Sequence, residues 1–211
     1  STQRSTLFPY TTLFRSRLLS LDRLGPGRFR SRLGDANLNG RAYGGQTLGQ
    51  ALAAAGADVG SDRPATMMQA LFLQGVDPFR PVDFEVTTLQ QGKRFTSRHV
   101  RATQGDRAVL DAQTSFAAAN AAPEHAAVSL ALGEDPRSLP DLAALAPWQP
   151  LLQHLSGYAS QTKLAIDFRL PYPERQLAPG GEPRVRYWMR ARQALPREGR
   201  LHAAAFAYLS D

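Results

Sequence analysis

The residue types that most often carry out chemistry are sparse in this sequence, and their spacing excludes several kinds of catalytic site. There are no cysteines, so disulfides, thiolate metal sites and cysteine nucleophiles are excluded. The four histidines, His99, His125, His154 and His202, have no partners at the spacing typical of metal ligands. A Gly-x-Ser-x-Gly motif, which marks the nucleophile of many serine hydrolases, is also absent. We therefore interpret the histidines as structural or surface residues and expect no metal and no cofactor.

Two short segments retain residues that could take part in chemistry. Gly44 and Gly45 precede Gln46 in the sequence YGGQ, and Asp211 follows the sequence AYLS. The glycines would let the backbone approach another group closely, although they favour a structural role at the start of a tightly packed helix. Gln46 would lie in the first turn of that helix. Taken alone, Asp211 would be a solvated side chain, because most aspartates are exposed.

The basic character of the chain comes almost entirely from arginine. The formal net charge is +7, and arginines outnumber lysines by 23 to 2. Proteins that bind nucleic acid usually gather basic residues on one face or helix, whereas these are scattered, so we expect no nucleic-acid partner. Arg94, Arg98 and Arg101 fall within one predicted strand, where they could bind phosphates or simply face solvent. The solvated interpretation is favoured.

Hydrophobic periodicity predicts one helix and one sheet in the first half of the chain. From Gly45, small and apolar residues recur at helical spacing as far as Gly56, which predicts a largely buried helix. Four strand candidates follow the helix, at residues 66–74, 82–89, 95–103 and 108–116, and short extended segments precede it within 27–43. Tight-turn sequences around Gly92 and Gly105 predict that the last three of these strands form an antiparallel meander.

The same order of strands and helix begins again after a linker. Alternating apolar residues predict two strands, one around Ile166 and one around Met189, and helical spacing returns from Gly199. We expect the chain to stop within this helix, in a truncated second repeat. The predicted domains are an N-terminal domain at 17–118, an Ala-, Pro- and Leu-rich linker at 119–162 and the start of a C-terminal domain at 163–211.

The N-terminal segment has a different origin. Residues 6–16, TLFPYTTLFRS, show no period of 2 or 3.6 and match the in-frame translation of a widely used sequencing-library adapter. Pro9 and the lack of a continuous apolar run with a small-residue cleavage site argue against a signal peptide. We interpret residues 1–16 as non-native. No apolar run approaches the roughly 18 residues of a membrane-spanning helix, so we expect a soluble protein without a membrane partner. The absence of cysteines is compatible with the cytoplasm, the location that we expect.

Several motifs in the same order resemble one enzyme family. They are similar to segments of bacterial acyl-CoA thioesterase II, over nearly all of residues 20–211, and read YGGQTLGQALAAA, FLQGVDPFRPVDFEVTTLQQGKRFTSRHVRATQGD, QTSFAAA, RYWMRARQALP and AFAYLSD. Any one motif would be weak evidence, but the ordered set is specific. The resemblance implies an α+β double hotdog fold, each unit an antiparallel sheet wrapped around a long helix. It also implies hydrolysis of fatty acyl-CoA to free fatty acid and CoA.

The resemblance also assigns roles to residues. In that family an Asp, a Thr and a Gln activate water, and the Asp of the Tyr-x-Ser-Asp motif corresponds to Asp211. The Thr and Gln would lie beyond residue 211, so we expect this chain to be inactive although the intact protein is an enzyme. A carboxylate base suits a thioester, which is already electrophilic and needs no covalent nucleophile. Free N–H groups at the helix N-terminus could stabilise the oxyanion.

Substrate-binding residues and partners complete the expectations. We expect acyl-CoA to contact Gly44, Gly45, Gln46, Arg94 and Arg98. We also expect a homo-oligomer, because apolar faces would otherwise be left uncovered. The alternative is a non-catalytic acyl-CoA-binding hotdog module. A hotdog dehydratase is disfavoured, because such enzymes usually need a histidine and an acid at the helix, and GGQTLGQ has neither.

Overall fold

The computed structural model divides the chain into two compact units. The first consists of Ser1–Asn120 and Leu195–Asp211, and the second of Ala121–Ala194. The residues that the structure describes are 18–32, 34, 40–121, 123, 125, 134–141, 166–176, 186–191 and 195–211. The adapter-like residues 6–16 and most of the predicted linker therefore lie outside the described residues.

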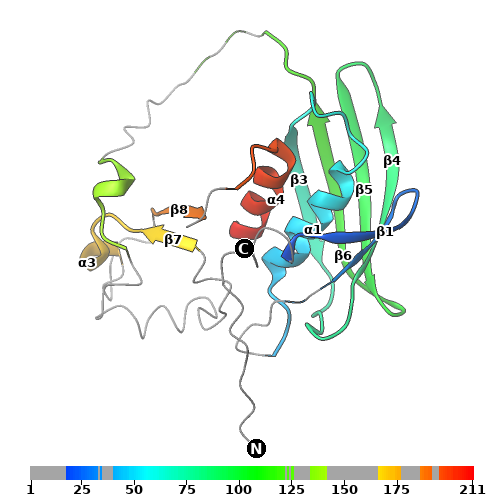
Figure 1. Cartoon of the computed structure of the whole chain (residues 1–211), viewed down its shortest axis with the longest axis horizontal. Helices are drawn as coiled ribbons and strands as arrows, with labels where there is room; N and C mark the ends of the chain where they lie inside the picture. Colours follow the sequence, from blue (N-terminus) through cyan, green and yellow to red (C-terminus); the bar gives the residue numbers. More distant parts are fainter. Residues whose placement is uncertain are drawn as a thin grey trace, which may run out of the picture. The chain divides into compact units, whose positions relative to one another are not determined.

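The first unit contains a six-stranded antiparallel sheet (Figure 1). Its strand order is β1-β2-β4-β5-β6-β3. The predicted meander is confirmed, because β4 pairs with β5 and β5 with β6, and the turn at Gly105 has the positive φ that favours glycine. The strands are β1 (Leu21–Gly25), β2 (Arg28–Ser31), β3 (Ala65–Phe72), β4 (Asp83–Gln91), β5 (Phe95–Gln104) and β6 (Arg107–Ala117).

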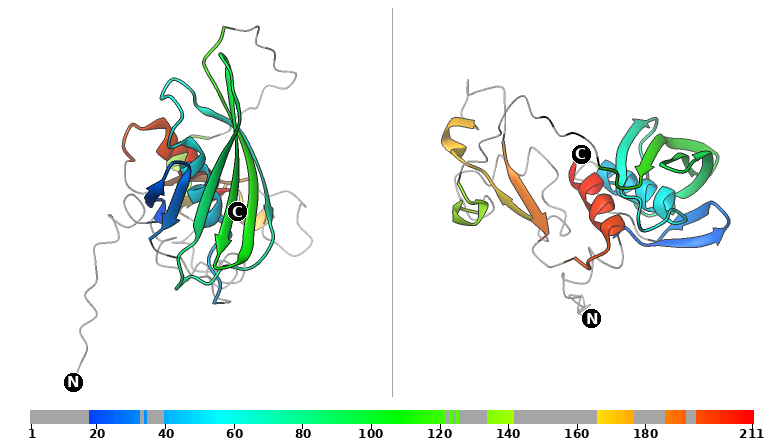
Figure 2. Two further views of the ribbon diagram at one scale, coloured as in Figure 1. Left: turned by 90° about the vertical axis from the view of Figure 1, so that its right-hand side faces the viewer. Right: turned by 90° about the horizontal axis from the view of Figure 1, so that it is seen from above.

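The helix α1 (Gly44–Gly56) lies against one face of this sheet, as predicted. Figure 2 shows the sheet curving past the helix. The buried small residues of α1 pack with inward side chains of the sheet in one core. This core includes Ala51 and Ala55 of α1 and Phe84, Val100 and Leu110 of the strands. Every second residue of β5 is buried, and those between are half-buried or exposed, the pattern of a sheet with one covered face. The unit is therefore an α+β layer of one sheet on one helix.

A second helix, α4 (Gly199–Leu209), packs along α1 within this first unit (Figure 1). The two helices run antiparallel, because Gly45 lies at the carbonyl of Tyr208 and Gly49 lies at the carbonyl of Ala204. A β-carbon on Gly49 would stand 2.7 Å from the Ala204 oxygen. The glycines therefore permit a close approach of the two helix backbones. The predicted domain boundaries stay a prediction.

The helix α4 ends at Leu209, and Ser210 follows as its C-terminal cap. The Ser210 hydroxyl donates to the carbonyl of Ala207 at 2.8 Å. Asp211 therefore lies beyond the helix rather than on its surface. The expectation that the sequence stops within a longer helix stays a prediction. No helix among the described residues is long and apolar enough to cross a membrane.

The second unit contains a two-stranded antiparallel pair, which confirms both predicted strands. The strand β7 (Ile166–Arg169) pairs with β8 (Trp188–Ala191), and Asp167 lies opposite Arg190. A short helix, α3 (Pro173–Gln176), follows β7, and a 3-10 turn, η2 (Pro136–Ser138), lies in the predicted linker. The order β7, β8, α4 repeats the order β1, β2, α1 along the sequence.

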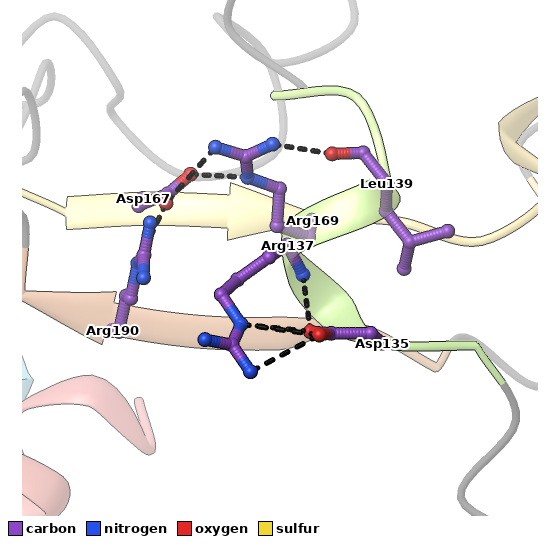
Figure 3. A network of polar contacts seen from close by, with 6 residues as sticks. All are labelled: Asp135, Arg137, Leu139, Asp167, Arg169 and Arg190. Carbon is purple, nitrogen blue, oxygen red and sulfur yellow. Dashed lines mark hydrogen bonds and ion pairs between the residues drawn. The ribbon is translucent and has the colours of Figure 1, made fainter.

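A buried carboxylate links the strands β7 and β8 of the second unit (Figure 3). Asp167 is 2% exposed, and its two oxygens accept hydrogen bonds from Arg169 Nε at 2.6 Å and Arg190 Nε at 2.8 Å. Arg169 also donates to the carbonyl of Leu139, which ties the β7 strand to the 3-10 turn. The hydrogen bond from Arg169 lowers the pKa of Asp167 most, and Arg190 adds to it against the opposing effect of burial.

Asp167 makes the β7–β8 pair sensitive to acid. Because its pKa is lower in the folded state, the ion pairs stabilise that state above the unfolded pKa of about 3.9 and the effect is lost as pH falls through the folded pKa. We expect Asp167→Asn to lower the free energy of opening the β7–β8 strand pair by about 1–3 kcal/mol at neutral pH. The substitution should also abolish the loss of that free energy at acid pH. Amide hydrogen exchange of β7 and β8 measures both. The exposed Asp62→Asn is the control, and an unchanged acid dependence in Asp167→Asn would contradict the assignment.

Candidate active site

Two residues 166 positions apart meet at the N-terminus of α1. The Oδ2 oxygen of Asp211 accepts a hydrogen bond from the backbone N–H of Gly45 at 3.0 Å. Gly45 is the second residue of α1, and the first N–H groups of a helix have no partner within it. The positive end of the helix dipole suits a carboxylate at this place. The structure therefore brings Asp211 and Gly45, two of the predicted site residues, into direct contact.

The space around the YGGQ sequence requires glycine at position 45 and is close-packed at position 44. A β-carbon on Gly44 would stand 2.9 Å from Asp211 Oδ2 and 3.2 Å from the ring of Phe72. A β-carbon on Gly45 would overlap the carbonyl oxygen of Tyr208 and stand 2.5 Å from the ring of Tyr43. The structural role and the role in the site are thus the same, because the close helix contact brings the carboxylate to Gly45.

Sequence reasoning missed two aromatic residues at this site. Tyr43, directly before the glycines, is buried, and its hydroxyl shares its one proton between the backbone oxygens of Tyr208, in α4, and Asp211, just beyond it. Phe72, the last residue of β3, places its ring beside Gly44. The position of Tyr43 next to the glycine pair was an available signal. The sequence contained no such signal for Phe72, because the closeness of its ring to Gly44 depends on how the edge strand β3 lies against α1.

An apolar groove adjoins the carboxylate. It has a volume of about 410 Å³ and runs between α1, β3 and α4. Phe72 and Ser210 lie at the end nearest Asp211, and Leu48, Met68 and Phe206 line it further along. A second cavity of about 450 Å³ shares Leu52, Ala65 and Ala203 with it, and its lining includes Arg63, Arg197 and Arg200. Among the described residues, no three His, Asp or Glu side chains are placed to hold a metal ion.

Comparisons with known proteins point to one family. Residues 34–117 match the model of the acyl-CoA thioesterase N-terminal domain. Human acyl-coenzyme A thioesterase 8 is 32% identical over 183 residues, or 81% of this chain and 56% of the relative. The mouse protein of that name is 30% identical over 206 residues, 92% of this chain and 63% of the relative. The TesB protein of Mycobacterium avium subspecies paratuberculosis is 27% identical with a TM-score of 0.65, and covers 92% of this chain and 66% of that one. These similarities support the acyl-CoA thioesterase II family, the family that the sequence motifs resemble.

The fold comparison agrees with this acyl-CoA thioesterase II assignment. A protein from Alicyclobacillus acidocaldarius described as having a hot dog fold has a TM-score of 0.67 at 16% identity, over 90% of this chain and 67% of that one. The expected α+β hotdog fold is confirmed. The chain spans between about half and two thirds of the length of the named curated relatives. Its second hotdog unit stays a prediction.

Gln46, a predicted substrate-binding residue, has structural partners. It is 3% exposed, and its Nε2 donates to the carbonyl of Leu18 at 3.2 Å. Gln50, one turn later, donates to the same carbonyl at 2.6 Å. The two amides therefore anchor the segment that leads into β1. A role of Gln46 in substrate binding stays a prediction.

The three arginines differ from one another more than the sequence predicts. Arg94 is exposed and precedes β5, so the expectation of one strand holding all three is wrong. Arg98 is 4% exposed and donates to Gln91 Oε1 at 2.9 Å, so the expectation of solvent exposure is wrong for this residue. It lies on the inward face of β5 with Val100, whereas Arg101 is exposed. Within the described residues, the structure gives no hydrogen bond or ion pair between Arg94 or Arg98 and Asp211.

Proposed function

We propose that the protein to which this chain belongs hydrolyses acyl-CoA thioesters, with Asp211 as general base. The supporting observation is the 3.0 Å contact between the Asp211 carboxylate and the N–H of Gly45. This bond holds Oδ2, and Oδ1 has no hydrogen-bond partner among the described residues. Oδ1 takes a proton from water as the water oxygen bonds to the thioester carbon. The carbon–sulfur bond then breaks, and the CoA sulfur leaves as a thiolate, a good leaving group because thiol pKa values are near 8.5. The thiolate takes the proton from Asp211, which restores the carboxylate base.

The first turn of α1 serves the base in this proposal. The N–H of Gly45 binds the carboxylate, and the N–H of Gln46 donates to the carbonyl of Tyr43 at 3.1 Å. These two groups are therefore engaged in this structure, whereas the sequence predicts free N–H groups for the oxyanion. The helix N-terminus holds a negative charge at a fixed place, which is the condition that a general base needs.

The apolar groove is the proposed site for the acyl chain. One end, at Phe72 and Ser210, lies beside Asp211, where the thioester carbon must be held. Its lining is mostly Leu, Met, Phe and Ala, and burying methylene groups on such side chains is favourable by about 0.8 kcal/mol each. Fatty acyl groups therefore fit this site better than polar ones.

Ala203 lines this groove at a point where a larger side chain would impose a length limit. It precedes Ser210 by seven residues, or about 10 Å along α4, and an extended chain of carbon atoms advances about 1.2 Å per bond. Ala203→Met is expected to obstruct chains longer than about nine carbons and to lower their kcat/KM about 10-fold, with little effect on six-carbon substrates. A series of saturated acyl-CoAs measures this. The control is His202→Met at the neighbouring exposed position, and equal effects on short and long chains would contradict the assigned path.

The direct test of function uses the full-length protein. Thiol release from a series of acyl-CoAs reports hydrolysis, and isothermal titration with a non-hydrolysable acyl-CoA thioether reports binding. Hydrolysis that depends on Asp211 supports the proposal. Saturable binding without thiol release overturns it and favours the non-catalytic acyl-CoA-binding module.

The quaternary structure is part of the same proposal. The strand β3 is an edge of the sheet, and its Met67, Leu71 and Phe72 are 47%, 61% and 51% exposed. An exposed apolar edge strand favours association with another chain or unit, so we include a homo-oligomer in the proposal. The cytoplasmic location and a role in fatty acid metabolism stay predictions of the sequence.

A further inference from the structure

Tyr43 connects the two helices of the first unit through its hydroxyl. The hydroxyl lies 2.6 Å from the carbonyl oxygen of Asp211 and 3.0 Å from that of Tyr208. The Tyr43 side chain is 7% exposed, and its ring packs edge-on against the ring of Tyr208, with centroids 4.9 Å apart. A buried tyrosine usually requires a hydrogen-bond partner for its hydroxyl, and here the partners are backbone atoms around the base.

Tyr43 stands at the N-terminal cap of α1 but does not cap that helix. Its side chain makes no capping hydrogen bond to α1. The last carbonyls of a helix lack partners within it, and Tyr208 is in the last turn of α4. The hydroxyl of Tyr43 therefore satisfies the end of the opposite helix. The same hydroxyl also lies within hydrogen-bond distance of the backbone oxygen of Asp211, an exposed residue just beyond that helix.

Tyr43 and Gly45 hold Asp211 at two different places. The Tyr43 hydroxyl binds the main-chain carbonyl of Asp211, and the Gly45 N–H binds the side-chain carboxylate. The two donors are two residues apart on one rigid helix start. The first bond therefore restrains the backbone of Asp211, and the second restrains its carboxylate.

We propose that Tyr43 is a positioning residue for Asp211. Its hydroxyl fixes the backbone of Asp211, so that the carboxylate stays against the Gly45 N–H and Oδ1 keeps one direction. The positioning itself needs only the contacts above, and its catalytic consequence rests on the proposed function. Because the bond joins two fixed groups, losing it costs about 1 kcal/mol, which corresponds to roughly a five-fold change in the population of the bonded arrangement.

The amide signal of Gly45 tests this proposal without measuring activity. In the unsubstituted chain the hydrogen bond to the Asp211 carboxylate should displace the Gly45 amide proton downfield, and the amplitude is the size of this displacement relative to Asp211→Ala. Tyr43→Phe removes only the hydroxyl and is expected to reduce the amplitude by about half or more. Tyr172→Phe, which removes the hydroxyl of a 54% exposed tyrosine, is the matched control. An amplitude in Tyr43→Phe equal to that of the unsubstituted chain would overturn the proposal.

Two further readouts separate positioning from stability and from the proposed function. Tyr43→Phe keeps the ring packed on Tyr208, so the melting temperature should fall by only about 2–4 °C. In the full-length enzyme, Tyr43→Phe should lower kcat about five-fold with KM unchanged, and a change confined to KM would count against positioning. If Asp211→Asn leaves hydrolysis intact while the Gly45 signal still depends on Tyr43, the proposed function fails and the positioning stands.

Discussion

Asp211→Asn is expected to lower kcat for acyl-CoA hydrolysis by about 10²–10⁴-fold, the usual contribution of a general base. The asparagine amide has nearly the same shape, and its oxygen can still accept the hydrogen bond that Gly45 donates to Asp211. It cannot take a proton from water. Because the substitution removes an interaction made only in the transition state, KM should change little.

The Asp211→Asn experiment needs a matched control and a check of folding. Asp106→Asn, at the exposed turn between β5 and β6, makes the same chemical change away from the site. It should leave thiol release unchanged. The melting temperature of Asp211→Asn should stay within a few degrees of the unsubstituted protein. A kcat for Asp211→Asn within two- to three-fold of the unsubstituted enzyme would contradict the role of general base.

Gly45→Ala is expected to damage both stability and activity. Its methyl group would overlap the backbone oxygen of Tyr208 and approach the ring of Tyr43 to 2.5 Å, so α1 and α4 must move apart. Overpacking of this kind costs about 1–3 kcal/mol of unfolding free energy, which a denaturant titration measures. Moving α4 away also takes Asp211 from the Gly45 N–H, so kcat should fall about as far as in Asp211→Asn.

Two other glycine substitutions separate packing from chemistry. Gly49→Ala places a methyl 2.7 Å from the Ala204 oxygen and should destabilise the helix pair, but Gly49 lies one turn along α1 from Gly45, the residue that Asp211 contacts. Gly199→Ala meets no atom within 4 Å and should be neutral or slightly stabilising, because alanine has less freedom in the unfolded chain. If Gly45→Ala and Gly199→Ala behaved alike, the close helix contact would not be the cause.

Local patterns were enough to predict the elements that carry the site. Helical spacing from Gly45 gave α1, and alternation with turn residues gave the meander of β4, β5 and β6. These patterns depend on neighbours a few residues apart, so a single sequence contains them. The strand β1 was missed because its central residues are exposed, and its pairing with β2 is what defines it.

The contacts that form the site join residues far apart in the sequence, so local patterns do not predict them. Asp211 and Gly45 are separated by 166 residues, and no local pattern records that they meet. Family resemblance singled out both residues but not their contact, nor the part of Tyr43. Arg98 shows the same limit, since its charge predicts exposure and only the inward face of β5 explains its burial.

The most direct test of water activation by Asp211 is a single turnover of acyl-CoA in water labelled with oxygen-18, with enzyme in excess over substrate. A general base directs water to the thioester carbon, so the fatty acid should carry one labelled oxygen and Asp211 none. Label found in the Asp211 carboxylate, with an unlabelled acid, would show a covalent acyl-aspartyl intermediate and contradict the account.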